Sequence, residues 1–171
     1  PELMQACIKK SGQDVSPELM RAQIEVGTSV CRNVQQAGDE VRRLRNIIAE
    51  EAFRFGYAPI AVSKHPFAKW LEQKQTAQDR YSALTQEIQA TARRLLIFGM
   101  HVHVGIEDQE LRIDLMNQLS YFLPHMLALS CSSPFWESEN TGLKSYRLTV
   151  FDALPRTGLP EQFESYAEYE R

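Results

Sequence analysis

Residues 99–105, with the sequence Gly-Met-His-Val-His-Val-Gly, restrict the folds open to this chain more than any other segment. Side chains alternate between the two faces of a β-strand, so the methionine and the two valines share one face while His101 and His103 share the other. We therefore predict a strand over 100–106, with its apolar face against helices and its imidazole face open to a ligand.

The rest of the chain alternates short strand-like segments with amphipathic helices. Apolar residues recur at helical spacing over 34–55 and 81–95, and Gly56 is a natural stop for the first of these helices. Over 108–131 the pattern predicts a helix that Pro124 kinks or splits, with a buried second half. The predicted elements are helices over 2–10, 34–55, 81–95 and 108–131, strands over 23–28, 57–63 and 100–106, an ordered loop region over 132–160, and a short C-terminal helix.

These elements predict an α+β fold in which helices cover one sheet face and polar groups occupy the other. The strands lack the continuous Val/Ile runs of a buried parallel sheet. With 171 residues, 43% hydrophobic and 24% charged, the chain has the composition of one soluble domain with a core. The net charge of -3 carries no basic excess that would indicate nucleic acid, and the apolar stretch around 119–129 is too short to span a bilayer.

Three widely separated cysteines, Cys7, Cys31 and Cys131, make an odd count with no Cys-x-x-Cys spacing. A disulfide framework or a thiolate zinc site is therefore not expected. Reduced thiols in a cytoplasmic protein are the prediction that fits this pattern.

Two histidines on one sheet face suit either metal ligation or contact with phosphate groups. The alternative is that both imidazoles only hydrogen-bond to neighbouring polar groups, and the His-x-His pattern alone slightly favours it. Glu25 lies within the predicted strand 23–28 and points away from Ile24 and Val26, while Glu18 lies seven residues earlier. Carboxylates of this kind suit magnesium, but a solvated sheet face is the alternative, and for Glu18 alone it is the favoured one. An odd spacing within one strand also places the two on opposite faces unless a turn or bulge intervenes.

A loop rich in serine, glycine and proline carries the third candidate group, which is Lys144, Arg147 and Arg156. Such cations in a loop bind carboxylate or phosphate groups, but the spacing of a P-loop is absent and a solvated basic loop is the simpler interpretation. Tyr81 lies on the apolar stripe of the helix predicted over 81–95, so packing in the core is its default role.

In their order along the chain, these motifs resemble the carboxylate–amine ligases called glutamate–cysteine ligase 2. No single motif is specific, but the ordered series is, and it covers nearly the whole chain. The family is similar to glutamine synthetase in its catalytic core, where a comparable Gly-Met-His-x-His strand lies in the active site. The segments that carry the resemblance are 23–28, 65–70, 79–81, 99–105, 132–136, 141–147 and 154–160.

The resemblance implies an antiparallel sheet curved around an ATP and magnesium site, and an acyl-phosphate reaction. ATP would phosphorylate the side-chain carboxylate of glutamate, and an amine such as that of cysteine would displace the phosphate. It also implies a role for each candidate. Glu25 and the less certain Glu18 would bind magnesium, and His101 would bind a metal that bridges to the nucleotide. His103 would lie beside His101 on a phosphate group. Tyr81 would border the amino-acid pocket, and Arg147 would hold the transferred phosphoryl group.

Members of the family begin with a strand of acidic metal ligands and continue well beyond the point that matches residue 171. The resemblance therefore implies that 1–171 forms a single, partial ligase domain that has little activity alone and dimerises through exposed sheet edges. Three alternatives remain open at this point. They are a non-catalytic subunit that keeps the fold and binds a partner, a metal hydrolase built on the two histidines, and a portion of a longer ligase.

Overall fold

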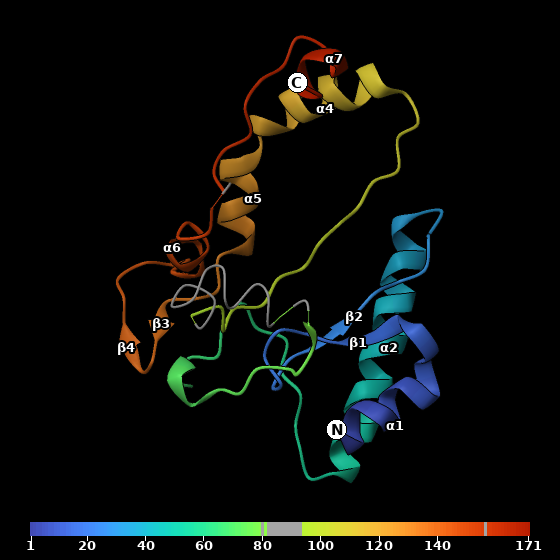
Figure 1. Ribbon diagram of the computed structural model, residues 1–171, viewed down its shortest axis with the longest axis vertical. Helices are drawn as coiled ribbons and strands as arrows, with labels where there is room; N and C mark the ends of the chain where they lie inside the picture. The colour runs from blue at the N-terminus through green and yellow to red at the C-terminus, as the bar shows by residue number, and fades with distance from the viewer. Residues whose placement is uncertain (80, 82–93, 156) are drawn as a thin grey trace. The chain divides into compact units, whose positions relative to one another are not determined.

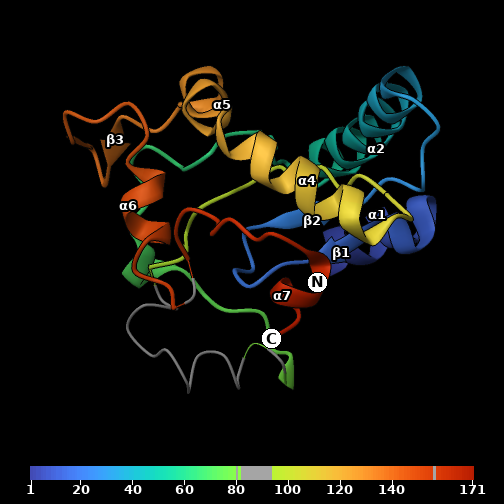
Figure 2. The same cartoon turned by 90° about the horizontal axis from the view of Figure 1, so that it is seen from above.

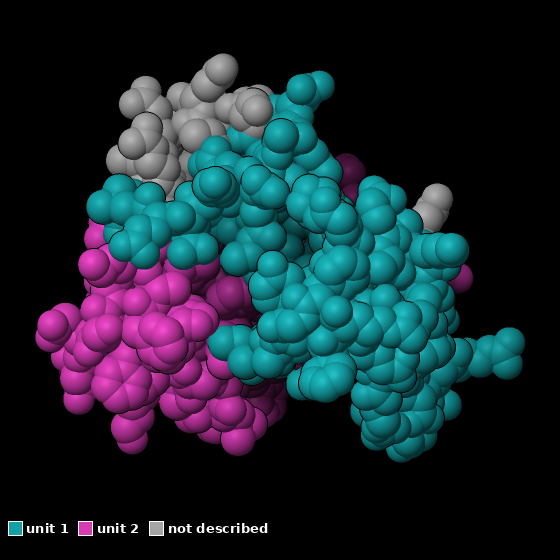
Figure 3. Space-filling model, turned by 90° about the horizontal axis from the view of Figure 1, so that it is seen from below, with its two compact units in different colours: residues 1–61, 70–93 teal, residues 62–69, 94–171 magenta. Residues whose placement is uncertain are grey.

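The computed structural model describes residues 1–79, 81, 94–155 and 157–171. These residues form helices and small antiparallel sheets, in agreement with the predicted α+β class. They divide into two compact units, coloured separately in Figure 3. Unit 1 comprises 1–61 and 70–93, and unit 2 comprises 62–69 and 94–171. The prediction of a single domain stays a prediction.

Unit 1 is built on two helices, α1 (Glu2–Ser11) and α2 (Val34–Arg54), which lie side by side in Figures 1 and 2. Both were predicted, and Gly56 follows α2 with a φ of 74°, which favours glycine. Asn33 caps α2 by accepting a hydrogen bond from the Gln36 amide at 2.8 Å. Leu44, Ile48 and Ala52, at helical spacing on α2, are buried and contribute to the core of this unit, whereas Val34 and Phe55 at the ends of the stripe are 89% and 42% exposed.

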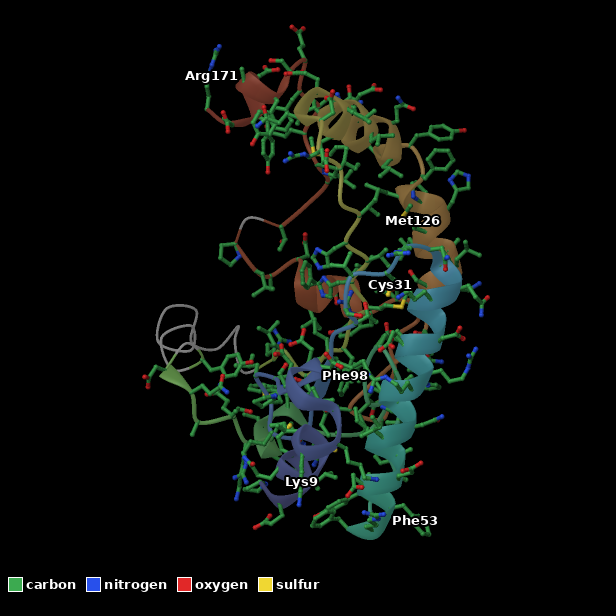
Figure 4. The ribbon with its side chains drawn as sticks, turned by 90° about the vertical axis from the view of Figure 1, so that its right-hand side faces the viewer. Lys9, Cys31, Phe53, Phe98, Met126 and Arg171 are labelled. Atoms are coloured by element: carbon green, nitrogen blue, oxygen red, sulfur yellow. The ribbon has the colours of Figure 1, made fainter. Side chains whose placement is uncertain are left out.

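That core is small and closely packed. Cys7 of α1 and Leu44 of α2 are completely buried, and Val15 and Ile48 complete the cluster. The buried carboxylate of Glu51 in α2 forms an ion pair with Lys10 of α1 at 2.6 Å, which joins the two helices. It also forms an ion pair with Arg54 of α2 at 3.0 Å. The outer side of α2 is exposed, as at Phe53, which is 82% exposed on its last turn (Figure 4).

A short hairpin adjoins the core. Strand β1 (Val15–Pro17) pairs antiparallel with β2 (Ile24–Val26), which occupies the middle of the predicted strand 23–28. Ile24 and Val26 pack against the core cluster, as their spacing predicts. After β1 the chain turns, and the Gln23 amide bonds the Met20 carbonyl at 2.9 Å. The short 3-10 helices η1 (Gly12–Asp14) and η2 (Trp70–Glu72) complete the described elements of this unit.

Unit 2 contains α4 (Gln109–Ser120), α5 (Leu123–Ser130), α6 (Arg147–Phe151) and α7 (Tyr166–Tyr169). Pro124 lies in the first turn of α5, where a proline is tolerated, so the predicted helix 108–131 is split as expected. In its described residues, the predicted loop region 132–160 also holds α6 and the hairpin of β3 (Phe135–Trp136) and β4 (Glu139–Asn140). The short C-terminal helix is confirmed as α7.

Three predictions for unit 2 and the adjoining chain are wrong. Residues 57–63 and 100–106 are not strands, because no ladder of backbone hydrogen bonds forms along them in the described chain. One backbone hydrogen bond, from the Phe98 amide to the Ser63 carbonyl at 2.8 Å, joins the end of the first segment to the residues just before the second. The second half of the predicted helix 108–131 is not buried either, since α5 has no buried residue and Leu129 is 90% exposed.

The remaining predictions are not tested by these elements. Most of the helix predicted over 81–95 lies outside the described residues, and so do Arg80 and Arg156. Both described sheets have two strands, so the larger curved sheet stays a prediction. Among the described helices, none combines the length and hydropathy that a membrane span requires.

Truncation of Leu44 tests the core of unit 1. We expect Leu44→Ala to lower the free energy of unfolding by about 2–5 kcal/mol, because a buried leucine leaves both lost contacts and a cavity. Urea denaturation followed by helical circular dichroism measures the loss. Leu71→Ala is the matched control, since Leu71 is 72% exposed in the same unit and its loss should change stability by less than about 0.5 kcal/mol. Equal losses in the two variants would contradict this core.

Candidate functional site

The six predicted site residues divide between the two units. Glu18, Glu25 and Tyr81 belong to unit 1, whereas His101, His103 and Arg147 belong to unit 2. The geometry within each unit follows.

Glu25 lies at the centre of β2, opposite Ser16 of β1. Its side chain is exposed, and its Oε2 accepts a hydrogen bond from Ser16 Oγ at 3.2 Å. The prediction that Glu25 points away from the apolar side of the strand is therefore confirmed. An exposed carboxylate with one such hydrogen bond suits either a metal ligand or a simple solvated glutamate.

Glu18 follows directly after β1 and lies outside the strands. The expectation that an odd spacing within one strand places Glu18 and Glu25 on opposite faces therefore does not apply. The Tyr81 hydroxyl lies 3.0 Å from Glu18 Oε2 and 3.1 Å from the Pro17 carbonyl oxygen, and it donates its hydrogen to this pair of acceptors. Thr76 Oγ1 donates to the Glu18 carbonyl, and the Thr76 amide bonds the Leu19 carbonyl at 2.9 Å. Tyr81 is only 6% exposed, so it packs in the core and also orients the Glu18 carboxylate.

Arg147 is the first residue of α6 and the most constrained of the unit 2 candidates. Its Nε donates to the Phe98 carbonyl at 2.7 Å, and its backbone amide donates to Ser133 Oγ at 3.0 Å. Phe98 is labelled in Figure 4. The guanidinium carbon lies 5.5 Å from the centre of the Phe151 ring, and burial lowers the pKa of Arg147. Within the described chain its terminal nitrogens make no hydrogen bond, so they remain available as donors to an anion.

Gly99 brings Arg147 and His101 together. A β-carbon placed on Gly99 would lie 3.0 Å from Arg147 Nη2 and 3.4 Å from His101 Nε2. Both side chains therefore use the space that glycine leaves open. A guanidinium and an imidazole over one exposed point of backbone form a site suited to a phosphate or carboxylate group.

His103 lies beside His101, as the alternation along the segment predicts. The two rings are nearly parallel, with centres 6.2 Å apart and planes 14° apart, and both residues are exposed. Met100, Val102 and Val104 are 88%, 77% and 74% exposed, so the helices expected to cover the apolar side chains of this segment do not cover them in unit 2. The pairing of the two histidines was predicted correctly, but the burial of the apolar side chains was not.

The donor chemistry of these residues suits metals, but their described arrangement is not a complete cage. Carboxylate oxygens are the ligands that magnesium prefers, and Glu18 and Glu25 provide them. Across the described ranges, no group of three or more His, Cys, Asp or Glu side chains lies close enough to hold a metal ion. The described residues therefore offer separate candidate donors and not a cluster of three.

Sequence reasoning missed the groups that hold Arg147. Ser133 is 2% exposed and binds the Arg147 amide, and Phe98 contributes only a backbone carbonyl. The serine pair at 132–133 was a visible feature, but a carbonyl acceptor carries no side-chain pattern and cannot be found from residue types. Lys144 was included among the basic loop residues; it is exposed, and its carbonyl accepts from the Ser133 amide at 3.1 Å.

Comparison with known proteins defines the class to which this arrangement belongs. The model of glutamate–cysteine ligase family 2 matches residues 2–171. The chain therefore belongs to glutamate–cysteine ligase family 2, as the ordered motifs predict.

Individual relatives agree with this family. The chain is 62% identical over 157 residues to a protein of Rhodospirillum rubrum, 56% identical over 169 residues to one of Ruegeria pomeroyi, and 51% identical over 157 residues to one of Roseiflexus sp.. Each of these relatives carries the provisional name glutamate–cysteine ligase 2. The alignments cover 92%, 99% and 92% of this chain but 40%, 44% and 41% of the respective relatives, so the chain spans less than half of their length.

Substitution of Gly99 tests the junction between Arg147 and His101. We expect Gly99→Ala to shift the NMR resonance of the Arg147 Nε–H group, because the new methyl group would lie 3.0 Å from Nη2. The Arg147→Lys variant identifies that resonance. Gly105→Ala is the control in the same segment, since a β-carbon there meets no atom within 4 Å. An unchanged resonance in Gly99→Ala would contradict the described junction.

Proposed function

We propose that this chain forms part of an ATP-dependent carboxylate–amine ligase of the glutamate–cysteine type. The observation that carries this proposal is the match of the family model to residues 2–171, which includes all six candidate residues. The meeting of Arg147 and His101 at Gly99 supports it, because a reaction through an acyl phosphate needs cationic donors around a phosphoryl group.

In the proposed reaction, the γ-phosphoryl group of ATP passes to the side-chain carboxylate of glutamate. The amine, that of cysteine in the reaction for which the relatives are named, then attacks the acyl phosphate and displaces inorganic phosphate. Arg147 would hold the transferred phosphoryl group through its terminal nitrogens, since Nε is already engaged by Phe98. This arrangement fixes the plane of the guanidinium in advance, so less orientational freedom is lost when the anion binds.

The other candidates would bind the nucleotide, the metal and the amino acid. Glu25 and Glu18 would provide carboxylate ligands to magnesium, and His101 an imidazole ligand to a metal that contacts the nucleotide. Magnesium, when bound, neutralises phosphate charge and orients the transfer. His103, stacked beside His101, would contact a phosphate group. Tyr81 would border the amino-acid pocket, and its hydroxyl would keep the Glu18 carboxylate oriented.

We propose that the complete ligase has a larger sheet than the two described hairpins. In the complete ligase we expect the curved antiparallel sheet of a glutamine synthetase-like core, with strands that complete the ligand set. We further propose a cytoplasmic enzyme that acts on small molecules, without nucleic-acid or membrane partners, and that forms homo-oligomers.

A second candidate function is a non-catalytic subunit that binds a partner protein. The exposed apolar surface of α5 favours it, because Met126, Leu127 and Leu129 are 48%, 39% and 90% exposed. This candidate predicts a folded chain that does not bind nucleotide, so the same binding experiment separates the two functions.

Nucleotide binding tests the proposed ligase site. We expect magnesium-dependent ATP binding by the chain in isothermal titration, and an increase of at least about tenfold in Kd for both His101→Ala and Glu25→Ala, or about 1.4 kcal/mol each. Each variant removes one proposed ligand from an exposed position, where the loss should not disturb the core.

Two variants serve as matched controls. His125→Ala removes an exposed histidine of α5, and Glu139→Ala removes an exposed glutamate of β4. Both should bind ATP as the unmodified chain does. A folded chain that binds no ATP, or equal losses in the controls and the site variants, would overturn the assignment of this site.

A further inference from the structure

Lys64 is a buried lysine in unit 2 that the proposed reaction does not use. It is 3% exposed, and its Nζ lies 3.6 Å from the centre of the Trp136 ring. Its described hydrogen bond is a long one, 3.4 Å to the His65 carbonyl. A buried ammonium normally has closer polar partners, so the face of the indole is its principal contact.

Lys64 closes a ring of contacts that passes through Arg147. Trp136 packs against Tyr146, with ring centres 5.1 Å apart, and Tyr146 directly precedes Arg147. Arg147 binds the Phe98 carbonyl through Nε, and the Phe98 amide binds the carbonyl of Ser63, which adjoins Lys64. Movement of one member of this ring must be accommodated by the others. Lys64 and Trp136 are therefore linked to the position of the Arg147 guanidinium.

The hairpin that carries Trp136 is also held by a contact with residues outside the hairpin. Its turn consists of Glu137 and Ser138, whose φ angles are 49° and 76°, and this left-handed conformation is usually occupied by glycine or asparagine. The Ser138 amide donates to the Pro66 carbonyl at 3.0 Å, close to the point where Lys64 covers Trp136. The segment 64–66 thus anchors both the strained turn and the strand before it.

We propose that Lys64 is a positioning residue for Arg147, acting through its cation–π contact with Trp136 and the ring of contacts that follows. The role in ligation rests on the proposed function of Arg147, whereas the contact network stands on the geometry of unit 2. Lys64 itself touches neither substrate nor nucleotide in this account.

The charge of Lys64 provides a spectroscopic signature of the contact. Burial lowers the pKa of Lys64 to about 8, and the nearby carboxylate of Glu137 opposes that shift. Loss of the proton removes the electrostatic part of the contact with the indole. Other titratable groups near this contact are Tyr146, which packs on Trp136, and His65, whose Nδ1 accepts from the Phe67 and Ala68 amides.

Tryptophan fluorescence between pH 6 and 10 tests the contact. The chain has two tryptophans, so Trp70→Phe leaves Trp136 as the sole tryptophan. In this background we expect an inflection near pH 8 that is absent from Lys64→Met and Lys64→Arg. Any pH-dependent change in Trp136 fluorescence that comes from Tyr146 or His65 persists in both Lys64 variants. It is thereby distinguished from the inflection that depends on Lys64. An inflection near pH 8 in Lys64→Arg would overturn the proposal, and this comparison holds even if Lys64→Met fails to fold.

The Arg147 Nε–H resonance tests the positioning role without any ligase assay. We expect it to shift or broaden in Lys64→Met and to be preserved in Lys64→Arg, which keeps the cation over the ring. The Arg43 Nε–H group, bonded to Glu40 at 3.1 Å in unit 1, is the internal control. An unchanged Arg147 resonance in folded Lys64→Met overturns the positioning role. Failure of nucleotide binding alone, with both signatures present, would instead count against the proposed function.

Discussion

The hydrogen bond from Arg147 Nε to the Phe98 carbonyl, 2.7 Å long, is the contact on which the organisation of the unit 2 site depends. It connects the first residue of α6 with the segment that leads to the two histidines. Because Nε is held by this bond and the backbone amide by Ser133, the guanidinium has a defined direction before any ligand binds. The absence of a side chain on Gly99 then allows His101 to lie beside it.

The acidic residues of unit 1 are organised by a different principle. Glu25 is fixed by its register in a short hairpin, opposite Ser16, whereas Glu18 is fixed by the buried Tyr81 hydroxyl. Neither carboxylate forms an ion pair with another described residue, so no described cation occupies the oxygens that a metal would need. The core of α1 and α2 supports this hairpin through Ile24 and Val26, which links the candidate ligand Glu25 to apolar packing.

Local periodicity predicted much of this structure, and its failures have a common cause. The helix over 34–55, the pairing of His101 with His103 and the break at Pro124 all follow from geometry within one segment. Strand formation and burial depend on partners elsewhere in the chain, so 57–63 and the apolar side of 100–106 were predicted wrongly. The site shows the same division. Arg147 was found from its residue type and family motif, but its acceptor at Phe98 is backbone and leaves no pattern.

We propose that Arg147 and His101 belong to one nucleotide site, with Arg147 on the phosphoryl group and His101 on the metal that contacts the nucleotide. A titration of magnesium and ATP into the isotope-labelled chain, followed through the Arg147 Nε–H and His101 imidazole resonances, tests it most directly. The account predicts that both resonances shift with one dissociation constant while the Arg43 Nε–H resonance stays unchanged. Shifts with different dissociation constants, or no shift at Arg147, would contradict it.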